Sequence, residues 1–200
     1  MGKARRLSRM WWRMNANKPL RYQLPGDVGE VLLSASALAH FRKRRQLKCL
    51  SKEAGGQLFA DLSIPGRITV LEATGPRSTD RCSVFSYRPD RTAERLEIAD
   101  RYKRGLHFVG DWHTHREDNP RPSSTDIRSM AEMFRESGHS FPGFLMVIVG
   151  RKDGPEALYV SYHSGHGWTR LDPSEFHQAS TQANTEDFLR SNELGHGANR

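Results

Sequence analysis

The sequence predicts one α/β (α+β) domain in which strands and helices are interspersed along the chain. Three observations support this fold class. The chain has 200 residues, which suits a single domain with a sizeable hydrophobic core. Short apolar stretches punctuated by Gly and Pro occur between segments whose apolar residues recur at helical spacing. Neither an internal repeat nor a low-complexity block interrupts this pattern, so one mixed domain is expected.

The first half of the chain is expected to contain one helix and three strands. In residues 30–46, apolar side chains recur close to helical spacing, and four basic residues gather at the end, where positive charge favours a helix C-terminus. Three short and partly alternating stretches are predicted as strands, at residues 54–62, 67–73 and 82–87.

The second half of the chain alternates between the two kinds of element. Helices are predicted at residues 91–103, 123–137 and 174–190. Strands are predicted at residues 106–115, 143–150, 156–164 and 167–172. The globular domain is therefore expected to span residues 20–190, with a basic arm before it (residues 1–19) and a short tail after it (residues 191–200).

Positive charge is concentrated at the N-terminus. Residues 1–25 hold seven basic residues and no acidic one, whereas the remaining 24 basic residues nearly balance the 23 acidic ones, so nearly all of the net charge of +8 lies in residues 1–25. The arm also carries Trp11 and Trp12, apolar side chains that gain from covering a surface. It is either a disordered segment or an element that docks on the domain or on a partner.

Several classes of protein are disfavoured by what the chain lacks. No apolar run approaches the length of about 20 residues that a membrane span needs. The basic N-terminus has no apolar segment of the kind found in secretory signals. Cys49 and Cys82 do not form a disulfide framework or a metal-type cysteine pair. A cytoplasmic protein without membrane contact is therefore expected.

Two histidines one residue apart, His113 and His115, lie at the end of the strand predicted at residues 106–115. Because side chains alternate along a strand, both imidazoles project from one face, while Trp112 and Thr114 project from the other. Two imidazoles on one face can converge on a single metal ion. A pair of this kind is weak evidence by itself, since isolated surface histidines are common.

A third candidate ligand, Asp126, stands in the first turn of the helix predicted at residues 123–137. A catalytic zinc site needs three protein ligands and keeps the fourth position open. The sequence Ser123-x-x-Asp126 is also typical of an N-terminal cap, with Ser123 accepting a backbone bond and Asp126 complementing the helix dipole. The structural and metal-binding interpretations of these two residues are compatible.

Taken together, these residues resemble the JAMM (MPN+) metallopeptidase motif, His-x-His-x7-Ser-x-x-Asp, at every position. The family also has an upstream Glu in a Glu-x-Gly-Gly-like stretch, which Glu53 supplies in "KEAGGQLFA". Glu30 competes for this role but lacks the paired glycines and is expected to open a helix. The resemblance covers about residues 30 to 162. It implies a single JAMM/MPN-type domain with a mixed β-sheet flanked by helices, in a cytidine-deaminase-like arrangement.

The segments "GPRSTDRCSVFSYRPDR" and "GLHFVGDWHTHRE" are similar to the bacterial branch of this family that is encoded in anti-phage CBASS operons. That resemblance implies a deubiquitinase-like isopeptidase that removes a ubiquitin-like or conjugated protein. A nucleotidyltransferase conjugated by E1–E2-like proteins is the implied substrate. One departure is visible, because many relatives have Pro after the second histidine, where this chain has Arg116.

The resemblance implies a zinc ion (Zn²⁺) held by His113, His115 and Asp126. Such an ion lowers the pKa of a coordinated water from 15.7 to about 7. Glu53 is expected to accept the proton of that water and to pass it to the departing amine. The Ser123 hydroxyl is expected to donate to the oxyanion, a contribution of about 3 kcal/mol for a good donor. Its hydroxyl is free for this role if the backbone of Ser123 makes the helix cap.

Three other functions stay open at this stage. The basic arm would suit a nucleic-acid-binding protein, although nucleic acid is the less favoured partner. An inactive MPN scaffold is disfavoured by the complete ligand set. Another activity on the same fold, such as a DNA-repair-associated RadC-like role, is possible because fold and site do not fix the substrate.

Overall fold

The computed structural model describes residues 18–139 and 141–174. Its main body is an eight-stranded mixed sheet with the strand order β1-β2-β4-β3-β7-β8-β9-β10. The strands of this sheet are β1 (Leu20–Gln23), β2 (Glu30–Leu33), β3 (Gly55–Asp61), β4 (Arg67–Ala73), β7 (His107–Thr114), β8 (Gly143–Val149), β9 (Leu158–Ser164) and β10 (Gly167–Leu171). Strands β2 and β4 run parallel, as do β7 and β8, and the remaining neighbours are antiparallel. The expected mixed α/β (α+β) architecture is confirmed.

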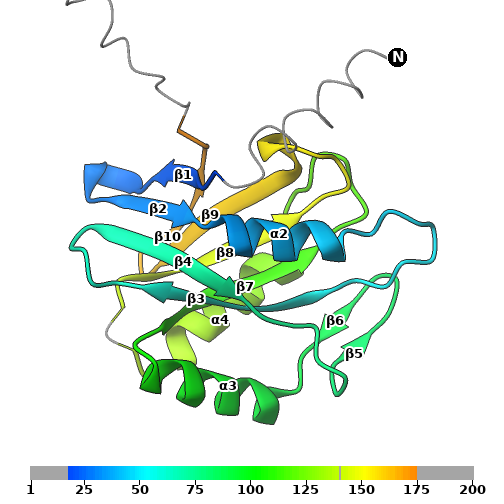
Figure 1. Cartoon of the computed structure of the whole chain (residues 1–200), viewed down its shortest axis with the longest axis horizontal. Helices are drawn as coiled ribbons and strands as arrows, with labels where there is room; N and C mark the ends of the chain where they lie inside the picture. The colour runs from blue at the N-terminus through cyan, green and yellow to red at the C-terminus, as the bar shows by residue number, and fades with distance from the viewer. Residues whose placement is uncertain (1–17, 140, 175–200) are drawn as a thin grey trace, which may run out of the picture.

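Three helices cover the sheet, with α2 (Ala35–Arg44) on one face and α3 (Arg91–Lys103) and α4 (Ser124–Glu136) on the other (Figure 1). The larger core lies on the α2 side, where Ala37, Leu38 and Phe41 pack with inward side chains from strands along the whole sheet. The smaller core lies under α4 and contains Met130 and four residues of β8 and β9, which are Phe144, Met146, Ile148 and Tyr159. The candidate site is on this second face.

The two ends of the sheet approach each other. Tyr22 of β1 forms an antiparallel bridge with Pro173, just after β10, and the Ser174 amide donates to the Arg21 carbonyl at 2.8 Å. This contact closes the sheet around the larger core, in which Tyr22 and Leu171 are both buried. A closed sheet leaves fewer unpaired backbone groups at its edges.

Most predicted elements coincide with observed ones, and two expectations need correction. Residues 30–33 form strand β2 instead of the start of a helix, and α2 begins only at Ala35, capped by the Ser34 side chain. The strand expected at residues 82–87 is a hairpin of two short strands, β5 (Arg81–Cys82) and β6 (Tyr87–Arg88), with a turn between them. The first error arose because Val31 and Leu32 lie four and three residues before Ala35, as in a helix, whereas Val31 and Leu33 alternate as buried residues of a strand. The helix predicted at residues 174–190 lies almost entirely outside the described residues.

Two short 3₁₀ turns, η1 (Pro25–Asp27) and η2 (Pro155–Ala157), complete the connections. Within the described ranges, no helix has both the length and the apolar character needed to cross a membrane.

Candidate metal centre and its adjoining pocket

Strand β7 presents His113 and His115 on the α4 side of the sheet. The side chains of Trp112 and Thr114 point to the other face, towards α2. There the Trp112 indole donates to the Thr74 carbonyl at 2.9 Å, and the Thr114 hydroxyl oxygen accepts from the Ala54 amide at 3.0 Å. On the opposite face, the Nε2 atoms of His113 and His115 lie 3.1 Å apart. The ladder continues past Thr114, because the His115 amide donates to the Val149 carbonyl. Strand alternation therefore places both imidazoles as expected.

The first turn of α4 brings Asp126 to the two histidines. Its carboxylate oxygens lie 3.4 Å from His113 Nε2 and 3.5 Å from His115 Nε2. The same carboxylate accepts from the Ser123 amide at 2.6 Å, and the Ser123 hydroxyl oxygen accepts from the Asp126 amide at 3.2 Å. This reciprocal pair is a capping box, which fixes the helix N-terminus and the Asp126 rotamer together.

The expected cap, in which Ser123 accepts a backbone bond, is confirmed, and the side-chain oxygen of Ser123 makes it. A hydroxyl that accepts one bond still carries its own proton. The oxyanion-donor role of Ser123 stays a prediction.

Glu53 approaches the histidines from the segment that precedes β3. One carboxylate oxygen of Glu53 and one ring nitrogen from each of His113 and His115 all lie within 4.8 Å of one another. Its position is fixed by the backbone, since the Glu53 amide donates to the Ser83 carbonyl at 2.7 Å. The competing acid, Glu30, stands instead on β2, where it forms ion pairs with Arg21 and Arg67.

Steric crowding explains why glycine occupies positions 55 and 56. A Cβ atom on Gly55 would lie 2.5 Å from Cδ1 of Tyr87, and one on Gly56 would lie 1.9 Å from the Thr74 carbonyl oxygen. Such distances are far below van der Waals contact, so a side chain at either position would displace a neighbour. Glycine at both positions allows the segment carrying Glu53 to pack closely against β7 and the hairpin.

The charge states of the acids differ. Burial raises the pKa of Glu53, and the nearby negative charge of Asp126 raises it further against the opposing effect of His113. Burial also acts to raise the pKa of Asp126, but hydrogen bonds from His113 and Ser123 hold it well below its usual range. Burial lowers the pKa of His115, with a further contribution from His113. Asp126 is thus an anion beside a neutral imidazole, whereas Glu53 is poised to carry a proton.

The spacing of these atoms fits a tetrahedral metal ion. With zinc–ligand distances of about 2.0–2.1 Å, two ligand atoms at a tetrahedral angle are about 3.3 Å apart. The two histidine Nε2 atoms lie 3.1 Å apart, and a different Asp126 oxygen lies near each of them, Oδ1 at 3.4 Å from His113 and Oδ2 at 3.5 Å from His115, so all three separations are close to that value. The anionic carboxylate of Asp126 and the neutral imidazole of His115 are also protonation states that metal binding requires. His113, His115 and Asp126 could therefore hold zinc.

A pocket of about 170 Å³ extends from these residues between α4 and the segment that contains the β5–β6 hairpin. Its lining consists of Glu53, Tyr87, Pro89, Arg91, Asp111, Trp112, His113, Thr125, Asp126, Ser129, Met130, Met133 and Met146. Asp111 stands two residues before His113 and so shares its face of β7. Burial raises the pKa of Asp111 to about 7, and the Glu94 carboxylate adds to this effect.

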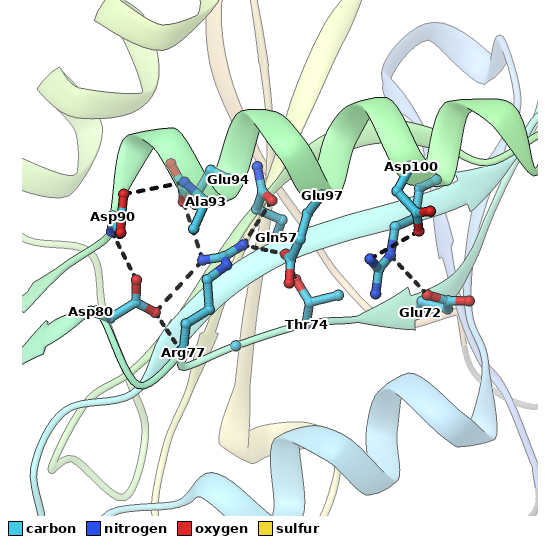
Figure 2. A network of polar contacts seen from close by, with 12 residues as sticks. Gln57, Glu72, Thr74, Arg77, Asp80, Asp90, Ala93, Glu94, Glu97 and Asp100 are labelled. Carbon is cyan, nitrogen blue, oxygen red and sulfur yellow. Dashed lines mark hydrogen bonds and ion pairs between the residues drawn. The ribbon is translucent and has the colours of Figure 1, made fainter.

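A buried polar network under α3 holds the hairpin wall of the pocket (Figure 2). The Arg77 guanidinium donates to Gln57 of β3 at 2.9 Å and to Glu97 of α3. The Asp80 carboxylate accepts from the Arg77 amide at 2.6 Å, from the Asp90 amide at 2.8 Å and from the Tyr87 hydroxyl at 3.0 Å. These bonds tie residues 77–90 to the sheet and to α3, which fixes the Tyr87 ring beside Gly55.

The structure brings Glu53, His113, His115 and Asp126 together, with Ser123 at the adjacent helix cap. Sequence reasoning did not identify Tyr87, Arg91 or the three methionines as pocket residues. Asp111 adjoins the site as its place in the sequence indicates, since strand alternation puts it on the same face as His113. Nothing in the linear sequence reveals the other lining residues, because they come from separate elements that only the fold brings together.

The fold is that of a JAB-type domain. The chain belongs to the prokaryotic homologs of the JAB domain, whose family model matches residues 34–163.

Three relatives that share one name, CD-NTase/cGAS isopeptidase, are similar to this chain. The chain is 34% identical over 149 residues to a CD-NTase/cGAS isopeptidase of Pseudomonas aeruginosa, covering 70% of this chain and 89% of the relative. It is 33% identical over 127 residues to a protein of the same name from Vibrio cholerae, covering 62% of this chain and 78% of the relative. A third such protein, from Enterobacter hormaechei, is 26% identical over 134 residues, which is 66% of this chain and 74% of the relative.

Two proteins solved in solution also resemble this chain. One, from Desulfitobacterium hafniense, has a TM-score of 0.48 at 20% identity and covers 72% of this chain and 88% of its own. The other, from Salinibacter ruber, has a TM-score of 0.40 at 28% identity, with 66% and 80% covered.

Proposed function

We propose that this protein is a zinc-dependent isopeptidase that releases a conjugated protein from the amine to which its C-terminal tail is attached. The isopeptidase activity follows from membership of the JAB family and from relatives named CD-NTase/cGAS isopeptidase. The observation that supports the metal is the convergence of the His113 and His115 Nε2 atoms, 3.1 Å apart, with the Asp126 carboxylate, whose two oxygens lie 3.4 and 3.5 Å from them. The proposed setting is CBASS-like deconjugation in the bacterial cytoplasm.

The proposed substrate is a CD-NTase joined to another protein by E1–E2-like enzymes. The names of the relatives supply the CD-NTase, and isopeptidase chemistry requires that a ligation step made the bond beforehand. The pocket between α4 and the β5–β6 hairpin opens directly from the candidate metal centre. It is the proposed binding site for residues next to the scissile bond.

Each site residue has a proposed task. His113, His115 and Asp126 would hold zinc, which when bound supplies the Lewis acidity that activates water and polarises a carbonyl. Glu53, with its raised pKa, would take a proton from the attacking water and deliver it to the leaving amine. Ser123 would donate its hydroxyl hydrogen to the carbonyl oxygen as negative charge develops there.

The test combines metal analysis with two inhibitors. We expect purified protein to bind about one zinc ion per chain, and a chelator to abolish cleavage of a protein conjugated through its C-terminus, with added zinc restoring it. Alkylation of thiols should leave the rate largely intact, because neither the exposed Cys49 nor the partly buried Cys82 lines the pocket. Loss of activity with the alkylating agent but not with the chelator would instead indicate a thiolate nucleophile.

A further inference from the structure

Asp111 has no role in the proposed metal chemistry, yet it lines the pocket beside the candidate metal centre. Its Oδ1 atom is buried and has no hydrogen-bond partner within the described part of the chain. A buried carboxylate oxygen without a donor destabilises the folded protein, and more so when the group is charged. Native proteins rarely keep such an atom unless something else binds to it.

The cations nearest to Asp111 are bonded to other acids. Arg91 also lines the pocket, but its Nη1 atom donates to Glu94 at 2.8 Å. Arg77 donates to Gln57 and Glu97 in the network under α3. Nε and Nη1 of Arg77 have no hydrogen-bond partner among the described residues, but neither guanidinium group donates to Asp111 Oδ1, which is therefore open to a donor from outside the described residues.

The rest of the pocket suits a long, unbranched side chain. Met130 and Met133 of α4 and Met146 of β8 form an apolar wall, and Tyr87 and Pro89 lie on the hairpin side. Methionine thioethers are flexible and polarisable, so they adapt to an aliphatic stem. A stem packed here would carry its end group towards the acid.

The acids that line the pocket indicate that the end group of this side chain is positively charged. The pocket is lined by three acids, Glu53, Asp111 and Asp126, and by one arginine, which is already paired. Asp126 and Glu53 have tasks at the metal centre, so Asp111 is the acid that has none. A cation gains a charge-assisted bond at this position, whereas an acidic side chain would be repelled.

We propose that this pocket binds a lysine or arginine side chain of the substrate's tail, with its stem against Met130, Met133 and Met146 and its cationic end on Asp111. The inference rests on the proposed function for the identity of the ligand as a substrate tail. Asp111 is then a specificity-determining residue of the isopeptidase.

The experiment uses the zinc-loaded Glu53→Gln protein and short acetylated alanine peptides. One position at a time is replaced by lysine, arginine, norleucine or glutamate. Norleucine keeps the aliphatic stem of lysine and lacks its charge. Affinity is measured by titration, and occupancy of the pocket is measured by NMR of ¹³C-methyl methionine. Asp111→Asn removes the charge at nearly constant shape, and Asp100→Asn on the exposed face of α3 is the matched control.

We expect lysine or arginine at one tail position to bind at least about tenfold more tightly than norleucine. The methyl signals of Met130, Met133 and Met146 should shift on binding. The preference should disappear in Asp111→Asn and survive in Asp100→Asn. Equal affinity for lysine and norleucine at every position overturns the inference, as does a preference that persists in Asp111→Asn.

The two proposals fail in different ways. Zinc-dependent cleavage without any preference for a basic residue leaves the proposed function standing and overturns the pocket assignment. Binding of basic peptides that depends on Asp111, in a wild-type protein that cleaves no conjugate with zinc present, supports the pocket and contradicts the isopeptidase. If Asp111→Asn fails to fold, the comparison of lysine with norleucine in the parent protein still decides the inference.

Discussion

Glu53 and Asp126 are both carboxylates beside the same two histidines, yet their surroundings move their pKa values in opposite directions. Burial dominates at Glu53 and favours the protonated form. At Asp126, hydrogen bonds from His113 and Ser123 overcome burial and favour the anion. Two acids whose environments separate their pKa values in this way are suited to different tasks, one as proton carrier and the other as ligand.

The first prediction follows from that difference. We expect Glu53→Gln to lower turnover by about 10²-fold or more while zinc stays bound, because only the proton carrier is lost. We expect Asp126→Ala, His113→Ala and His115→Ala to lower zinc occupancy as well. Kinetics and metal analysis on the same protein preparations measure both effects. A near-normal rate in Glu53→Gln would require another acid to be the base.

A second prediction concerns His163, which is 3% exposed on β9 and bonded to the Ser161 hydroxyl at 2.9 Å. Burial lowers its pKa from 6.5 to about 4. As the pH falls, His163 is therefore protonated near pH 6.5 in the unfolded chain but only near pH 4 in the folded chain. The stability that neutral His163 gives the folded state is fully present above pH 6.5 and is lost as the pH falls from 6.5 to about 4.

From pH 7 to pH 5, His163 should cost the folded state about 2 kcal/mol. Urea unfolding at the two pH values measures the loss. In His163→Gln, which can still bond to Ser161, the loss should be smaller by about that amount. An unchanged pH dependence in this variant would show that other groups cause the loss.

At the scale of elements, the N-terminus of α4 joins helix stability to the metal centre. Ser123 and Asp126 cap the helix by bonding to each other, so the cap also orients the proposed ligand. On the other side of the pocket, the β5–β6 hairpin is also held in place by polar bonds and also positions a residue of the pocket. Asp80 and Arg77 anchor it, and its Tyr87 ring lies against the backbone of Gly55. The two elements form opposite walls of one pocket.

The third prediction is made for the cap. We expect Ser123→Ala to destabilise the protein by about 1 kcal/mol through loss of the cap. We expect it to lower kcat by about 10²-fold through loss of the oxyanion donor. Ser123→Thr keeps the hydroxyl and should restore much of both, and Ser124→Ala is the neighbouring control. Normal kcat in a destabilised Ser123→Ala protein would limit Ser123 to a structural role.

At the scale of the whole molecule, the sheet closes through the bridge between Tyr22 and Pro173. Strand β1, the first strand of the sheet, begins at Leu20, directly after the predicted basic arm at residues 1–19. The division into an arm at residues 1–19, a domain at residues 20–190 and a tail at residues 191–200 stays a prediction. The structure does not describe residues 1–17 or 175–200.

The fourth prediction separates the arm from the domain. A variant that begins at Lys18 should keep its zinc, its fold by circular dichroism and its rate of conjugate cleavage. Any binding of duplex DNA at low salt should be lost with the arm, because phosphate contacts depend on clustered basic residues. DNA binding that persists without the arm would place the basic surface on the domain. Loss of cleavage would give the arm a part in substrate docking.

The sequence by itself determined the mixed fold class, most element boundaries and the candidate set of Glu53, His113, His115, Ser123 and Asp126. Local patterns carry this information, since strand alternation, helical spacing and a fixed motif each depend on residues close together in the chain. The same patterns were ambiguous at residues 30–33, where Val31 and Leu32 fit the helical spacing that continues to Ala35, and Val31 and Leu33 fit a strand. There, pairing of β2 with β1 and β4 decided the outcome.

Only the tertiary structure decided which side chains surround those residues. Tyr87, Asp111 and Met146 come from β6, β7 and β8, and no local spacing relates them. The same holds for Arg77 and Arg91, which donate to Glu97 and Glu94 and not to Asp111 Oδ1. Burial and partner choice depend on long-range packing, and so the shape and charge of the pocket cannot be obtained from the sequence alone.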